Sequence, residues 1–172
     1  PQDVAEATRA IVSVKRRARI RELVDGWPVA LDLLSSWSAM ASGECEGLGD
    51  LDIIRESRLG EFIVQDVLAL LTTREQAALV NASMLDSADI DILAGLAGQH
   101  GDGQILAELA FRFRGLVDRH NGQFLLQKAL RIWLRDAVEV FDGRSRADIL
   151  LAMADRCSEK GRLGEAATLA RR

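Results

Sequence analysis

Apolar residues recur at spacings of three and four along most of the chain, which is the period of an amphipathic helix. The pattern predicts helices over about 3–24, 28–42, 60–71, 72–83, 87–97, 104–113, 128–142, 147–158 and 165–170. Residues with β-branched side chains rarely cluster or alternate, so little of the chain suits an extended sheet. The sequence therefore predicts a mainly α-helical fold.

Three local signals mark where these elements begin and end. Gly26 suits the end of one helix, and Pro28 suits the start of the next because its missing N–H would have no partner there. Thr72 and Glu75 have the spacing of a capping box. Asn121-Gly122, between two short apolar stretches, predicts a β-hairpin. Three helices followed by this hairpin indicate a winged-helix-like domain.

These elements group into four segments. Residues 1–42 form a helical segment with a Gly-Trp-Pro motif, and residues 43–58 are predicted to be an acidic, Gly-rich linker. Residues 59–142 form the winged-helix-like domain with its short β-hairpin. Residues 143–172 are predicted to form a helical hairpin. The expected order is a helical bundle, then a winged-helix-like domain, then a pair of helices.

The composition is that of an ordinary globular protein, with 48% hydrophobic residues, 28% charged residues and a formal net charge of −4. No apolar run approaches the ~20 residues that span a bilayer, and no secretory leader opens the chain. This predicts a cytoplasmic protein with no membrane partner. The chain starts at Pro1 without an initiator Met, which suggests a fragment of a longer protein.

No catalytic or metal-binding motif is recognisable. None of the three lysines (Lys15, Lys128 and Lys160) follows a Gly and precedes Ser or Thr, so the chain has no Walker A phosphate loop. Cys157 falls on an apolar helical stripe, where a core position is expected. We therefore expect no enzyme activity, no metal and no cofactor in this chain.

A winged helix often reads DNA with its third helix, and Arg112, Arg114 and Arg119 lie at the end of that helix and the start of the wing. Residues 72–142, however, contain seven Arg or Lys and ten Asp or Glu, a net charge of −3. Because a surface that binds duplex DNA should be basic, direct DNA binding is not expected. The basic stretch 15–21 is predicted to be a solvated helix face.

Three stretches, in this order along the chain, carry a family resemblance. Residues 25–34 read Asp-Gly-Trp-Pro-Val-Ala-Leu-Asp-Leu-Leu, residues 62–97 include Leu-Leu-Thr-Thr-Arg-Glu and Ala-Ser-Met-Leu-Asp, and residues 159–166 read Glu-Lys-Gly-Arg-Leu-Gly-Glu-Ala. In one family, the first stretch resembles the segment after the NTPase core and the second resembles the start of the winged-helix domain. The third stretch resembles the turn of a tetratricopeptide-like repeat in the same family. This family is the large ATP-binding regulators of the LuxR type, the MalT-like branch of the STAND NTPases.

The resemblance implies a non-catalytic regulatory arm of a transcriptional regulator. The arm would couple an upstream nucleotide-binding core to downstream sensor repeats of the same chain, and ATP or ADP would bind in the parent protein. Because the Gly-x-Pro segment abuts the nucleotide in STAND proteins, Gly26, Trp27 and Pro28 are expected to be nucleotide-proximal. The same residues equally fit a capped helix start with a buried Trp.

Members of this family often carry His after the wing, where related proteins sense phosphate. Gln127 and Lys128 occupy that place here, either as a phosphate sensor or as solvated residues. The alternative from another class is a free-standing winged-helix repressor that contacts DNA through Arg112, Arg114 and Arg119. A third hypothesis is a helical adaptor unrelated to STAND proteins. A homodimer is also a possible assembly of this chain. The inducer and the target genes cannot be derived from the sequence.

Overall fold

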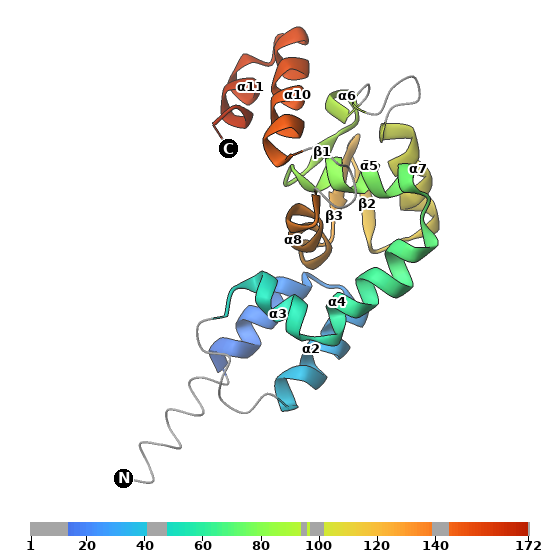
Figure 1. The fold of residues 1–172 in the computed structure, drawn as a ribbon, viewed down its shortest axis with the longest axis vertical. Helices are drawn as coiled ribbons and strands as arrows, with labels where there is room; N and C mark the ends of the chain where they lie inside the picture. Colours follow the sequence, from blue (N-terminus) through green and yellow to red (C-terminus); the bar gives the residue numbers. More distant parts are fainter. Residues whose placement is uncertain (1–13, 41–47, 94–95, 97–101, 139–144, 172) are drawn as a thin grey trace.

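The computed structural model describes residues 14–40, 48–93, 96, 102–138 and 145–171. Most of this part of the chain is helical, with a small antiparallel sheet in the middle (Figure 1). An N-terminal helical layer, the sheet with its helices, and a C-terminal helical hairpin follow one another along the long axis. The predicted mainly α-helical fold is confirmed.

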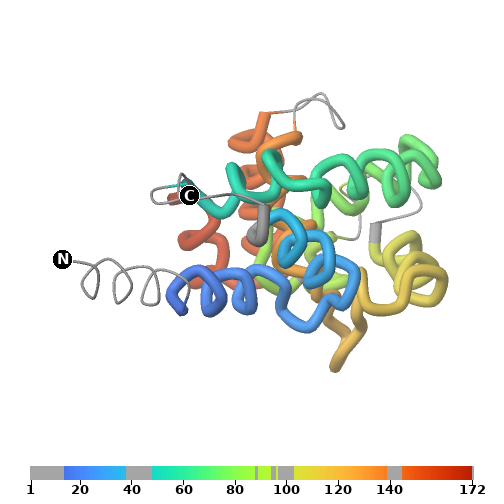
Figure 2. The backbone as a smooth tube through the Cα atoms, turned by 90° about the horizontal axis from the view of Figure 1, so that it is seen from below, coloured from blue at the N-terminus to red at the C-terminus, as the bar shows by residue number. Residues whose placement is uncertain are grey.

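The N-terminal layer contains a helix over residues 14–24, α2 (Pro28–Met40), α3 (Asp50–Glu56) and α4 (Arg58–Phe62). Figure 2 shows this layer from below, with the short turn that joins the first helix to α2. In that turn Asp25 and Gly26 have φ angles of 44° and 81°. Pro28 is the first residue of α2, so both boundaries predicted from the sequence are confirmed.

The prediction of an acidic linker over residues 43–58 is wrong for its second half. Residues 50–56 form α3, which buries Ile53 and Ile54 in the core. Asp52 accepts a hydrogen bond of 2.8 Å from the Gly49 N–H and so caps the helix. The acidic residues of this segment favoured the prediction of a linker, although its two adjacent Ile side chains form the apolar face of a helix. Residues 43–47 lie outside the described residues.

One helical rod connects this layer to the sheet. α4 continues into a π-helical turn, η1 (Ile63–Val67), and a 3-10 turn, η2 (Leu68–Leu70). Leu59, Ile63 and Val67 are four residues apart and buried, so one face of the rod packs on the core. The rod matches the helix predicted over 60–71, and its backbone becomes extended at Leu71.

The middle of the molecule begins with α5 (Thr73–Ser83). The Thr72 hydroxyl accepts a hydrogen bond from the Glu75 N–H, and the Glu75 carboxylate accepts one from the Thr72 N–H at 2.7 Å. These reciprocal bonds satisfy two backbone donors at the helix start. The predicted capping box is confirmed.

After α5 come β1 (Ala88–Asp89), α6 (Ile90–Leu93), α7 (Asp102–Arg112), β2 (Val117–His120), β3 (Gln123–Leu126) and α8 (Lys128–Asp136). The three strands pair antiparallel in the order β1-β3-β2. Asn121 and Gly122 turn the β2-β3 hairpin with φ angles of 50° and 78°, as a type I′ turn requires. The hairpin prediction is confirmed, whereas β1 was not predicted. The helix predicted over 87–97 therefore starts later than expected, with α6 at Ile90.

The C-terminal hairpin consists of α10 (Arg146–Glu159) and α11 (Leu163–Leu169), which pack against each other. Ser145 caps α10 through its hydrogen bonds with Asp148. α10 also packs on α6, which attaches the hairpin to the middle of the molecule. Cys157 is fully buried, as expected, and the helical hairpin predicted for this segment is confirmed.

Some apolar side chains of the predicted helices face solvent. Val14, Leu31 and Leu151 are 64%, 46% and 52% exposed. On α2, Ala30 and Leu34 are buried. These helices carry apolar residues around more than one face, so the position of the neighbouring helices decides which face is buried.

Candidate functional site

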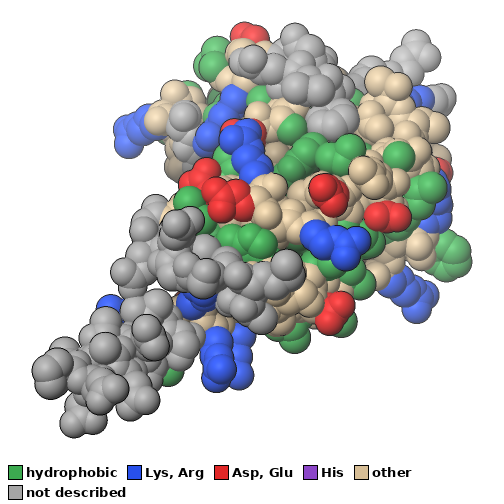
Figure 3. Space-filling view, turned by 60° about the horizontal axis from the view of Figure 1, so that its bottom comes forward, with side chains coloured by type: hydrophobic (Ala, Val, Ile, Leu, Met, Phe, Trp, Pro, Cys, Tyr) green, Lys and Arg blue, Asp and Glu red, His purple; other side chains and the backbone are tan. Residues whose placement is uncertain are grey.

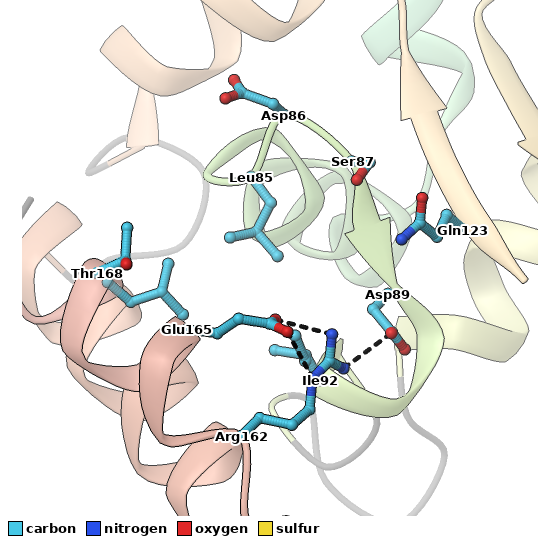
Figure 4. Close-up of a pocket in the computed structure, with 10 residues that line it drawn as sticks. Leu85, Asp86, Ser87, Asp89, Ile92, Gln123, Arg162, Glu165 and Thr168 are labelled. Atoms are coloured by element: carbon cyan, nitrogen blue, oxygen red, sulfur yellow. Dashed lines mark hydrogen bonds and ion pairs between the residues drawn. The ribbon is translucent and has the colours of Figure 1, made fainter.

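A pocket of about 340 Å³ lies between the C-terminal hairpin and the edge of the sheet (Figure 4). One wall is the segment from Leu85 through β1 to Ile92, and the other is α11 with the turn before it. β3 contributes Gln123. Small-molecule sites in proteins have volumes of about 300–1,000 Å³, and this pocket is at the lower end of that range.

Arg162 joins the two walls of the pocket. Its Nη1 donates to Asp89 Oδ2 at 2.8 Å, while Nε and Nη2 donate to the two oxygens of Glu165 at 2.9 and 2.7 Å. Figure 4 shows the three side chains pointing toward one another across the pocket. The hydrogen bonds with Asp89 and then Glu165 raise the pKa of Arg162. The guanidinium is therefore a fixed positive charge held between two carboxylates.

The local sequence explains why Arg162 takes this position. Gly161 has a φ of 74°, which ends α10 and turns the chain. The Arg162 N–H donates to the Cys157 carbonyl at 2.8 Å and the Gly161 N–H to the Ser158 carbonyl at 3.0 Å, the two bonds of a Schellman motif. The motif directs the residue that follows Gly161 toward β1.

Asp89 is positioned by the helix that follows its strand. One carboxylate oxygen accepts the Asp91 N–H at 2.8 Å, which leaves the other oxygen for Arg162. Lys160 Nζ lies 3.6 Å from the Asp91 carboxylate and makes a second link between the hairpin and the β1-α6 segment. Two ion pairs and the packing of α10 on α6 thus hold the hairpin in place.

Asp86 also lines the pocket, but its carboxylate pairs with arginines of α8 and not with Arg162. Its carboxylate points away from the Arg162 cluster (Figure 4) and lies 3.2 Å from Arg135 and 3.7 Å from Arg131, both on α8. Arg135 also donates to the Ser83 carbonyl, and burial lowers the pKa of its guanidinium. These contacts fix the loop after α5 on α8.

The Gly-Trp-Pro motif has a structural role in the observed fold. Trp27 is 5% exposed, and its ring lies 6.0 Å from that of Phe62 at an interplanar angle of 56°. The Leu31 N–H donates to the Trp27 carbonyl, so Trp27 also occupies the N-cap of α2. Gly26 and Pro28 remain exposed. In this conformation the indole ring has no free face on which a purine could stack.

The three arginines of the repressor hypothesis each lie over an aromatic ring. The guanidiniums of Arg112, Arg114 and Arg119 lie over three different rings, those of Phe113, Phe111 and Phe124, at 5.2, 5.9 and 6.0 Å. Arg112 also forms an ion pair with Glu75 at the start of α5.

Gln127 and Lys128 lie where the sheet meets α8. The Gln127 N–H donates to the Leu116 carbonyl at 3.1 Å, and its side-chain Oε1 is buried without a partner among the described residues. Lys128, the first residue of α8, is half-buried. The Gln127 side chain also carries two N–H donors on Nε2, and the role of Gln127 and Lys128 as a phosphate sensor stays a prediction.

Sequence reasoning missed Asp89, Arg162 and Glu165 as a group. Asp89 and Arg162 are 73 residues apart, and no local pattern connects them. The one available signal was Gly161, because a Gly in a turn between two helices directs the next side chain.

No protein family matches the chain, and no curated protein is significantly similar to it. None of the helices in the described residues is long and apolar enough to cross a bilayer. The same residues contain no group of three or more His, Cys, Asp or Glu side chains arranged to hold a metal ion.

Proposed function

We propose that the chain is a non-catalytic regulatory module, the arm of a MalT-like, ATP-dependent transcriptional regulator. It would couple a nucleotide-binding core before it to sensor repeats after it. The observation that supports this best is the order helix, strand, two helices and hairpin, with strands in the order β1-β3-β2, followed by a docked helical hairpin. This is the order expected for a winged-helix-like domain followed by the first helices of a tetratricopeptide-like repeat.

The position of α7 favours an arm over a DNA reader. In a winged helix that binds DNA, the third helix enters the major groove with its polar face. Leu106 and Leu109 on α7 are buried, and its terminal Arg112 is already paired with Glu75. On the face in Figure 3, Lys and Arg side chains lie among acidic and apolar ones and form no continuous basic patch. The ion pair of Arg112 with Glu75 argues against the rival repressor, because a DNA-reading arginine would be free to reach a base.

The way in which the C-terminal hairpin is held on the β1-α6 segment is compatible with a regulatory module that changes its packing. α10 packs on α6, and two ion pairs, Arg162 with Asp89 and Lys160 with Asp91, add links between the hairpin and the β1-α6 segment. Ion pairs open to solvent contribute only about 0–1 kcal/mol each, so these two add little to the apolar packing of α10 on α6. A change in that packing is the step by which the hairpin would shift between two states.

The test is nucleotide-dependent association with the segment encoded before residue 1. That segment should contain Gly-x-x-x-x-Gly-Lys-Ser or Thr. We expect a fluorescently labelled sample of this chain to bind the ATP and ADP forms of that segment with different affinities, measured by anisotropy. Absence of the phosphate loop, or equal affinity for both forms, would refute the proposal.

A further inference from the structure

We draw no further inference here: the strongest candidate, a hinge at the π-helical and 3-10 turns of the rod between the N-terminal layer and the sheet, carries nothing, because Leu59, Ile63 and Leu68 of this rod belong to one continuous hydrophobic core with the elements on both sides and nothing in the described part of the chain shows a second arrangement of the rod.

Discussion

Replacement of Trp27 by Ala separates a core role from a nucleotide-contacting role of the Gly-Trp-Pro motif. The Trp27 ring is 5% exposed and packs on Phe62 with ring centroids 6.0 Å apart. Truncation of a buried Trp or Phe to Ala costs about 3–5 kcal/mol, from lost transfer free energy and the cavity left behind. Domains have unfolding free energies of about 5–15 kcal/mol, so this loss would be a large fraction of the total.

The assay is urea unfolding followed by far-ultraviolet circular dichroism. Leu31→Ala is the matched control, because Leu31 lies on the same helix but is 46% exposed and should cost less than about 1 kcal/mol. Trp27→Phe should recover part of the loss because Phe keeps an aromatic contact with Phe62. A loss for Trp27→Ala no larger than that for Leu31→Ala would refute the core role.

Three further predictions concern single positions. Gly161→Ala should lose about 1 kcal/mol in urea unfolding because Gly161 has a φ of 74°, while Gly164→Ala, with no atom near its added Cβ, should be neutral or stabilising. Hydrogen bonding by the Thr72 N–H lowers the pKa of Glu75. The ionised Glu75 carboxylate therefore stabilises the fold fully at pH values above the unfolded pKa of about 4.3, and this stabilisation is lost as the pH falls through the lower folded pKa. Glu75→Gln should then destabilise the chain at neutral pH but not near pH 2. Burial raises the pKa of the Cys157 thiol, so in a Cys45→Ser background a thiol reagent should label it only on unfolding.

Each of these three predictions would be contradicted by one outcome. Equal stability of Gly161→Ala and Gly164→Ala would mean that the turn does not depend on the left-handed residue. A Glu75→Gln deficit that persists unchanged to pH 2 would exclude the carboxylate as its cause. Labelling of Cys157 at the same rate with and without urea would show that α10 does not shield it.

The features predicted correctly from the sequence are those in which cause and effect lie within a few residues. Gly26 and Pro28 set a helix boundary, Thr72 and Glu75 cap a helix, and Asn121-Gly122 closes a hairpin, each through local backbone geometry. These signals survive in the structure because packing does not compete with them.

The features that were missed depend on distant partners. β1 has only two residues, and its pairing with β3 determines its extended conformation. α3 carries an acidic surface, and its Ile53 and Ile54 became recognisable as core residues only in the presence of the other helices. The pocket likewise needs Asp89 and Arg162, 73 residues apart, to meet.

A regulatory arm of this kind should not read DNA, and a fluorescence titration of the chain against a labelled duplex library at low and moderate salt measures this. We expect no binding, or weak binding without sequence preference that salt abolishes. Arg112→Ala/Arg114→Ala should then behave like the control Arg58→Ala, which removes an exposed charge on α4. Binding of one sequence at roughly 10⁻⁸ M or tighter, lost in the double variant and kept in the control, would contradict the account and identify a repressor.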